Sequence, residues 1–318
     1  MPRPIANDRI TWSVIIPTFE RPHHLAKCLR SIAAIDWPKN DFEVIVVDDG
    51  GTVALNDIVG QCDNGIAVTL VHQRNAGPGA ARNRGASLAR GTYLAFTDDD
   101  CRPRPGWLRA LWSAMAGDAD MAGGPTVNVV DESPWSRTSQ LIIEAAYRYH
   151  NGDAGGTSFL ASNNMAVSAR RFRDIGGFDT RFRPASEDRD LCDRWLVAGY
   201  SIGFAPAAMV AHASDLDLPR FCLQHFNYGR GAFLYHRARR RRGRRSLARQ
   251  AAGHLAFLGM FGGPLARLPW HRVPPLATRL ALWQVLNIAG YLYQSAIAGG
   301  APAHPVRSGR DRVAGNRE

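Results

Sequence analysis

Acidic side chains follow two apolar segments of this 318-residue chain. The triplet Asp98–Asp100 comes directly after residues 93–97, and the pair Asp48–Asp49 comes directly after residues 44–47. Carboxylates at the end of a buried strand are costly unless a positive group binds there. In an open α/β sheet, ligands bind beyond the carboxyl ends of the strands. The two acidic segments therefore predict one site that holds a metal ion and a nucleotide.

The aspartate triplet predicts a site for a divalent cation. Mg²⁺ or Mn²⁺ takes oxygen ligands and is often bound by carboxylates together with the phosphates of a nucleotide. We expect Asp100 to be the first ligand, with Asp98 or Asp99 contacting the ribose or a metal-bound water. The spacing fits both a D-x-D pair (Asp98 and Asp100) and an adjacent pair (Asp99 and Asp100). The alternative is a solvated acidic turn, which the apolar segment before the triplet disfavours.

Strand and helix patterns alternate around these acids. Short apolar runs predict strands at residues 13–16, 43–47, 66–72 and 93–97, and apolar residues at helical spacing predict helices at 24–35 and 80–89. This alternation predicts an α/β fold with a doubly wound sheet that is parallel over residues 12–100. A strand within residues 122–130 and helices at 139–149 and 186–198 are expected beyond it.

The composition predicts a folded intracellular protein. The hydrophobic fraction of 45% is typical of a packed globular chain. The 5 cysteines show no C-x-x-C spacing, which indicates reduced thiols rather than a disulfide frame or a zinc site. The N-terminal residues lack the pattern of a secretory signal peptide. We therefore expect a cytoplasmic protein.

The net charge of +11 is concentrated in an arginine run. The run consists of Arg237, Arg239, Arg240, Arg241, Arg242, Arg244 and Arg245. It predicts an anionic partner for the C-terminal part of the chain. Because two apolar stretches follow, the run favours the cytoplasmic face of an anionic membrane over nucleic acid.

The last apolar stretch, residues 280–303, contains no Asp, Glu, Lys or Arg. It exceeds the roughly 20 residues that a membrane span requires. Gln284, Asn287 and Gln294 nevertheless make it a poor lipid-facing helix. We expect interfacial or packed helices here rather than a true span.

Taken in order, the motifs of residues 13–235 resemble those of family 2 glycosyltransferases, which have the GT-A fold. The matching segments are Ser13–Arg21, Val46–Gly51, Asn75–Asn83, Phe96–Asp100, Asn163–Ala166, Gly176–Asp179 and Glu187–Leu191. The resemblance implies a GT-A Rossmann-like doubly wound mixed sheet, followed by a C-terminal helical basic and apolar extension. It also implies an inverting transferase of the hexosyltransferase type, as used in polysaccharide biosynthesis. The donor would be linked to UDP, GDP or dTDP, and the acceptor would be a glycan or a lipid-linked molecule.

The resemblance assigns donor-site roles to residues on both sides of the sheet edge. The residues it places in the nucleotide-sugar site are Pro17, Thr18, Phe19, Glu20, Asp48, Asp49, Arg82, Asp98 and Asp99. Asp49 would accept a hydrogen bond from the base, and Arg82 would contact a phosphate near the start of a helix. Asp48 and Asp49 could instead be capping acids of a plain turn.

The resemblance also assigns catalytic and metal roles further along the chain. Asp188 would be the general base, with Glu187 beside it, and the helix dipole would keep these acids ionised. Simple helix capping is the alternative for both. His212 would join Asp100 and Asp98 at the metal or stabilise the diphosphate, unless it is only a satisfied polar residue. Arg230 would be a phosphate clamp.

We expect one GT-A domain with an extension. Residues 1–120 would bind the nucleotide sugar, residues 121–236 would bind the acceptor and supply the base, and residues 237–318 would form the extension. A sugar-phosphate nucleotidyltransferase would instead have a glycine-rich basic loop where Pro17–Glu20 stands, and a dinucleotide-dependent dehydrogenase would have G-x-G-x-x-G there. A non-enzymatic alternative is an anionic-polymer or nucleic-acid binder that uses the arginine run.

Overall fold

The protein is built around a seven-stranded sheet in the order β3-β2-β1-β4-β8-β6-β9. The computed structural model describes residues 10–61, 65–117, 119–130, 133–152, 156–243 and 254–299. The strands of this sheet are β1 (Trp12–Thr18), β2 (Phe42–Asp48), β3 (Ala67–His72), β4 (Tyr93–Thr97), β6 (Met121–Gly123), β8 (Asn164–Ser168) and β9 (Ile202–Phe204). β1 pairs in parallel with β2 and β4, and β2 with β3, which confirms the predicted parallel half. β8 is antiparallel to β4 and β6, so the whole sheet is mixed.

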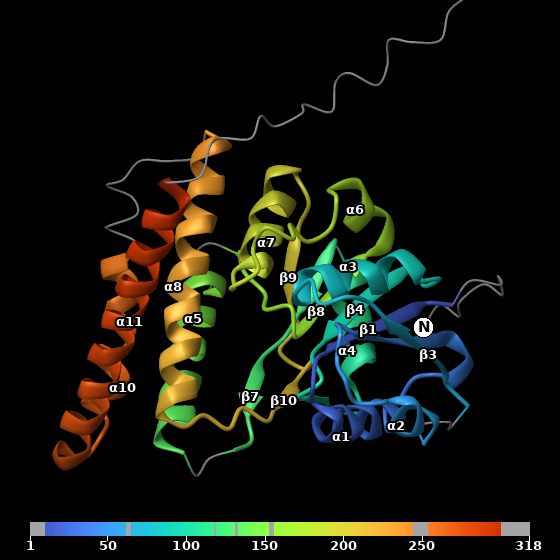
Figure 1. Ribbon diagram of the computed structural model, residues 1–318, viewed down its shortest axis with the longest axis horizontal. Coiled ribbons are helices and arrows are strands. Elements are labelled where there is room, and N and C mark those ends of the chain that lie inside the picture. The colour runs from blue at the N-terminus through green and yellow to red at the C-terminus, as the bar shows by residue number, and fades with distance from the viewer. Residues whose placement is uncertain are drawn as a thin grey trace, which may run out of the picture.

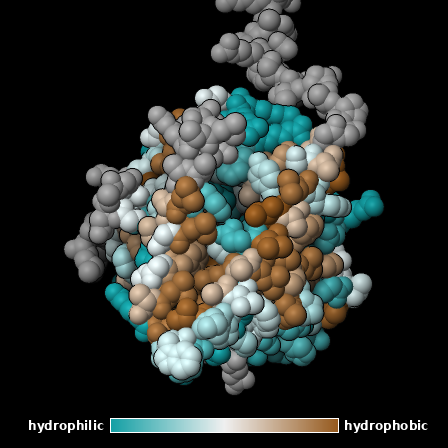
Figure 2. Space-filling view, turned by 90° about the vertical axis from the view of Figure 1, so that its left-hand side faces the viewer, coloured by the Kyte–Doolittle hydropathy of each residue, from teal (hydrophilic) through white to brown (hydrophobic). Residues whose placement is uncertain are grey.

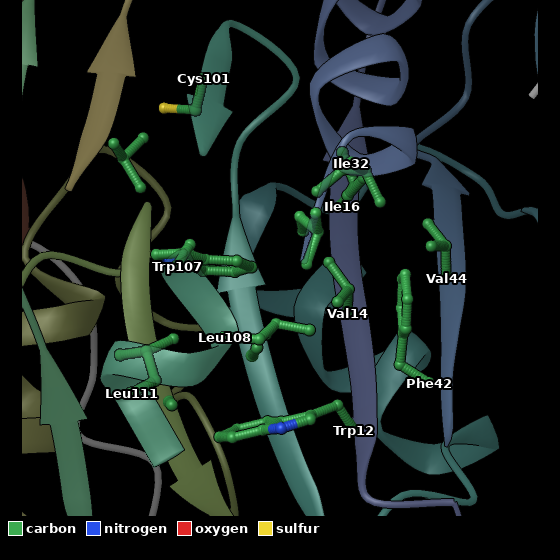
Figure 3. Close-up of a cluster of buried hydrophobic side chains, with 14 of the residues drawn as sticks. Trp12, Val14, Ile16, Ile32, Phe42, Val44, Cys101, Trp107, Leu108 and Leu111 are labelled. Carbon is green, nitrogen blue, oxygen red and sulfur yellow. The ribbon is translucent and has the colours of Figure 1, made fainter. Parts of the chain in front are cut away.

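Helices cover both faces of the sheet (Figure 1). One face carries α1 (Pro22–Ala33), α2 (Asn56–Gly60) and α4 (Trp107–Met115), and the other carries α3 (Pro78–Leu88), α6 (Ala169–Asp174) and α7 (Glu187–Val197). Alternation along a strand explains the two cores. Val14 and Ile16 of β1 pack with Trp107 and Leu108 of α4 (Figure 3), whereas Ile15 packs in a separate cluster on the opposite face.

A second, three-stranded sheet lies next to the aspartate triplet. It consists of β5 (Cys101–Pro103), β10 (Val210–His212) and β7 (Thr126–Asn128), in the order β5-β10-β7. The one strand predicted over residues 122–130 is instead two short strands, β6 and β7, which belong to different sheets. The break falls at Gly124, where a side chain would overlap the carbonyl oxygens of Ala205 and Ala208.

The C-terminal helices form a layer beside the sheet domain (Figure 1). Its members are α5 (Pro134–Asn151), α8 (Leu218–Arg241), α10 (Gly262–Ala266) and α11 (Val273–Gly299). Trp283 of α11 packs in one apolar cluster with Ile142 of α5 and Phe221 of α8. The packed helix expected over residues 280–303 is confirmed as far as residue 299, and residues 300–303 lie outside the described part. Within that part, no helix is long and apolar enough to cross a membrane.

The arginine run is partly used inside the protein. Arg242 donates to Asp190 and to Asp193 of α7, each at 2.8 Å, and Arg239 Nε lies 3.0 Å from Asp193 Oδ1. Arg242 is therefore ion-paired within the protein, and the anionic partner predicted for the run as a whole stays a prediction. Arg244 and Arg245 lie outside the described residues. α8 also passes through the expected boundary at residues 236–237 without a break.

The close contact between α8 and α11 depends on Gly290. A Cβ on Gly290 would overlap the carbonyl oxygen of Phe226. We predict that Gly290→Ala destabilises the protein by about 1–3 kcal/mol, because overpacking of a close helix contact forces the backbones apart. The measurement is the midpoint of thermal unfolding. Gly263→Ala in α10 is the matched control, because its Cβ would meet open space; equal midpoints for the two variants would contradict the close packing.

Candidate active site

The carboxyl edge of the sheet opens into a cleft of about 1570 Å³. Of the site residues predicted from the sequence, the cleft is lined by Pro17, Thr18, Phe19, Asp49, Arg82, Asp98, Asp99, Asp100, Glu187, Asp188 and His212. Glu20 and Asp48 are absent from its lining. The structure thus brings residues from strands β1 and β10, from the segments that follow β2 and β4, and from helices α3 and α7 to one surface.

Asp99 lies at the centre of the cluster between two donors. Thr18 Oγ1 donates to Asp99 Oδ2 at 2.7 Å. Arg21 Nη1 lies 3.2 Å from Asp99 Oδ1 and donates to Asp100 Oδ2 at 2.7 Å. Burial, together with the neighbouring Asp100, raises the pKa of Asp99 to about 7 in spite of Arg21. The buried Asp99 is therefore partly protonated near neutral pH, although Thr18 and Arg21 both stabilise its charged form.

Arg82 connects the aspartate triplet to α7. Its side chain is 3% exposed, and it donates to Asp98 Oδ1 at 2.6 Å and to Glu187 Oε1 at 2.9 Å. Burial disfavours the charged guanidinium, but Asp98 and Glu187 more than offset this and raise the pKa of Arg82. The predicted phosphate contact of Arg82 stays a prediction. What the structure adds is a buried link between two acidic segments, which the motif pattern did not reveal.

Asp188 lies beside Glu187 in the first turn of α7. Ser186, which precedes the helix, has a φ of 75°, an uncommon conformation for a residue other than glycine. Burial and the charge of Glu187 raise the pKa of Asp188 to about 7. Desolvation thus opposes the effect expected of the helix dipole, which favours the ionised form of Asp188. A pKa near neutrality suits a group that accepts a proton.

Asp100 and His212 form the candidate metal centre. β10 pairs with β5 so that His212 lies opposite Cys101, and His212 Nε2 is 3.3 Å from Asp100 Oδ1. Burial opposes the charge on both groups, yet their mutual attraction lowers the pKa of Asp100 and raises that of His212. One donor atom each of Asp100, Cys101 and His212 lies within 4.8 Å of the others. A carboxylate oxygen and an imidazole nitrogen fit a divalent transition metal such as Mn²⁺.

The predicted nucleoside residues differ in what they contact. Phe19 is 46% exposed in the cleft, as a stacking residue would be. Asp49 accepts hydrogen bonds from the backbone amides of Ala76 and Gly77 at 2.9 and 2.8 Å, which fixes the loop before α3.

Two other predicted residues stabilise loops at this edge. Glu20 Oε1 accepts from the Thr52 amide at 2.7 Å, and Asp48 Oδ1 accepts from the Gly51 amide at 2.9 Å. Both contacts hold the loop that follows β2. Their predicted contacts with a nucleotide stay predictions.

Beyond Asp188 the cleft continues between α5, α8 and α11, which the sequence pattern did not predict. Aromatic residues line this part, among them Tyr147, Tyr149, Tyr228, Tyr235, Phe257 and Trp283. Figure 2 shows the face of the molecule formed by these helices, with a hydrophilic hollow between two bands of apolar side chains. The prediction of a phosphate clamp at Arg230 is wrong, because its guanidinium donates to Gln294 of α11 and to Asn227 and is absent from the cleft lining.

The strand order of the sheet, the acids at its edge and the cleft beside them are those of the GT-A fold of nucleotide-sugar transferases. The family model "Glycosyl transferase family 2" matches residues 13–176. The chain belongs to this family.

Known proteins of similar sequence are glycosyltransferases. The chain is 31% identical to a pre-mycofactocin glycosyltransferase of Mycobacterium tuberculosis over 232 residues, which are 69% of this chain and 46% of that protein. It is 30% identical to glycosyltransferase AglE of Haloferax volcanii over 210 residues, or 63% of this chain and 66% of that one. The chain thus spans about half the length of the mycobacterial relative.

Solved structures share the GT-A fold. A mannosyltransferase of Pyrobaculum calidifontis, in complex with GDP-Man and Mn²⁺, has a TM-score of 0.63 at 20% identity, covering 93% of this chain and 90% of its own. TarS of S. aureus in complex with UDP has a TM-score of 0.53 at 17% identity, with 92% of each chain covered.

The metal centre predicts a graded response to loss of single carboxylates. We expect Asp100→Asn to weaken Mn²⁺ binding at least about tenfold, because it removes a ligand oxygen. Electron paramagnetic resonance of free Mn²⁺ measures the affinity. Asp98→Asn and Asp99→Asn distinguish the two possible ligand pairs. If the D-x-D pair binds the metal, Asp98→Asn weakens Mn²⁺ binding and Asp99→Asn does not. If the adjacent pair binds it, the reverse holds. Asp57→Asn in α2 is the control, and an affinity unchanged in Asp100→Asn would contradict this centre.

Proposed function

We propose that the protein is an inverting glycosyltransferase that moves a hexose from a UDP-, GDP- or dTDP-linked donor to a hydroxyl of a glycan or lipid-linked acceptor. One observation carries the proposal: Arg82 bridges Asp98 and Glu187, so the candidate metal centre and Asp188 face the same cleft. Family membership supports it, as do neighbours of the same fold whose structures contain GDP-Man with Mn²⁺ or UDP.

The donor would bind at the sheet edge. Phe19 and Thr18 would contact the nucleoside, and Asp100 and His212 would hold Mn²⁺ or Mg²⁺. When bound, this ion would neutralise the diphosphate charge that grows as the sugar departs. In this proposal residues 1–120 bind the donor, residues 121–236 contribute the base and bind the acceptor, and residues 237–318 form the helical extension.

Asp188 would take the proton of the acceptor hydroxyl. Its Oδ1 accepts a hydrogen bond from the Arg189 amide at 2.7 Å, which leaves Oδ2 for the proton. The acceptor oxygen would attack the anomeric carbon from the face opposite the diphosphate, and this attack inverts the configuration. The Glu187 charge raises the proton affinity of Asp188 and so favours transfer.

This role predicts a pH dependence with a defined sign. Activity should rise as the pH increases through about 7, because Asp188 must lose its proton before it can accept another. Asp188→Asn should lower kcat by about 10²–10⁴-fold. The measurement is release of nucleoside diphosphate from a panel of sugar nucleotides, with water as the acceptor where no other is known.

Glu187→Gln supplies the second arm of this test. Removing the neighbouring charge should move the midpoint of the pH profile to lower pH, because that charge helps to raise the pKa of Asp188. A profile that keeps its midpoint in Glu187→Gln, or an active Asp188→Asn, would show that another group is the base.

We also propose that the helical extension binds the cytoplasmic face of an anionic membrane. Trp270 is 85% exposed, and large apolar side chains of α11 outside the cleft, such as Val285 and Ile297, are also exposed. Arg240 and Arg241 are exposed at the end of α8. Exposed aromatic, apolar and basic side chains distributed along this layer suit the headgroup region of an anionic bilayer.

Vesicle binding tests this surface. We expect the protein to co-sediment with vesicles containing phosphatidylglycerol but not with pure phosphatidylcholine vesicles, and high salt should release it. The triple variant Trp270→Ser, Arg240→Gln, Arg241→Gln should bind several-fold more weakly. Equal binding of the variant and the wild type would contradict the proposal, and a fold check by circular dichroism accompanies both.

A further inference from the structure

The cleft next to Asp188 contains two arginines that flank one aromatic ring. The Arg189 guanidinium carbon lies 4.5 Å from the ring centroid of Tyr235, and that of Arg239 lies 5.6 Å from it. All three residues line the cleft. Tyr235 itself is buried, so its ring holds both guanidinium groups at the cleft wall.

The carboxylates around this ring leave positive charge unbalanced. Asp193 is shared, because Arg239 lies 3.0 Å from it and Arg242 lies 2.8 Å from it. Asp190 is shared in the same way between Arg194 and Arg242. Two carboxylates thus form ion pairs with three arginines.

Arg189 adds a further guanidinium beside this group. This guanidinium makes no ion pair in the part of the chain that the structure describes and lies against the ring of Tyr235, while its charge also acts on the carboxylate of Asp188. The charges of Arg189 and Arg239 also act on His150, which lines the cleft. Its burial first, and then the charges of Arg189 and Arg239, lower its pKa to about 3, so it is neutral and adds no charge.

We propose that Arg189 and Arg239 bind an anionic group of the acceptor, a phosphate or a carboxylate. This inference rests on the proposed function, since it treats the cleft beyond Asp188 as the acceptor site. Guanidinium groups bind both anions through paired hydrogen bonds, and a bound anion would balance the surplus charge. Arg189 and Asp188 both line the cleft and their charges interact, so the anionic group lies close to the hydroxyl that is glycosylated.

An aromatic wall of the cleft indicates which kind of group the acceptor carries next to its anion. Tyr149 and Trp283 each pack against Phe257, with ring centroids 5.8 and 5.9 Å apart, and all three rings line the cleft. An acceptor that places a charged group between the arginines would therefore have an apolar portion against these rings.

Calorimetric titration with simple amphiphiles tests the anion site. The probes are n-octyl phosphate, octanoate and the neutral n-octyl glucoside, added to the full chain with Mn²⁺ and the nucleoside diphosphate that stabilises it. That nucleotide occupies the donor end and keeps the probes from its phosphate positions. We expect the wild type to bind at least one anionic probe about tenfold or more tightly than the neutral one. The tighter of the two anions indicates whether the acceptor group is a phosphate or a carboxylate.

Two variants assign the preference to Arg189. Arg189→Met should weaken binding of the anionic probe about tenfold and leave the neutral probe unchanged, and Arg189→Lys should restore part of the loss. Arg173→Met, an exposed arginine of α6 outside the cleft, is the matched control. Thermal unfolding of each variant checks its fold.

The inference is overturned if the anionic probes bind no better than the neutral one, or if Arg189→Met keeps the preference. Its failure is distinguishable from failure of the proposed function. A protein that is stabilised by a nucleotide with Mn²⁺ but shows no anion preference retains the donor site and loses only this inference.

Discussion

The buried guanidinium of Arg82 is the contact on which the site depends. It joins Asp98, at the end of β4, to Glu187, at the start of α7, although these residues are far apart in the sequence. Loss of one partner of a buried ion pair typically costs about 3–5 kcal/mol, because the other charge remains unpaired. Arg82 thereby fixes the distance between the aspartate cluster and Asp188, which a reaction between two bound molecules requires.

The acids of the cleft are held in a state that favours a cation. Arg21 and Arg82 reach Asp98, Asp99 and Asp100, yet the pKa of Asp99 is still raised to about 7 by burial and its neighbours. Such crowding is unfavourable in the absence of a further positive charge. A divalent ion with its diphosphate would relieve it, so the same acids would destabilise the free cleft and stabilise the loaded one.

The sequence predicted the parallel half of the sheet well, because the strands that precede the acids are buried on both faces and read as continuous apolar runs. It also placed acids at the correct edge, since strand ends of this kind share one side of the sheet. It could not reveal that Arg82 pairs with Glu187, that Arg239 and Arg242 share Asp193, or that β6 and β7 separate at Gly124. Those features depend on contacts between distant segments, and no local pattern encodes them. The cleft beyond Asp188 was missed for the same reason, because α5, α8 and α11 meet only in the folded chain.

The central claim is that the acidic edge binds a nucleoside diphosphate together with a divalent ion. Thermal unfolding of the full chain with UDP, GDP and dTDP, each with and without Mn²⁺, tests it most directly. A ligand that binds the folded state raises the unfolding midpoint by mass action. The account predicts a rise with one nucleotide that requires Mn²⁺ and is lost in Asp100→Ala. No rise with any nucleotide, or a rise of equal size without Mn²⁺, would contradict it.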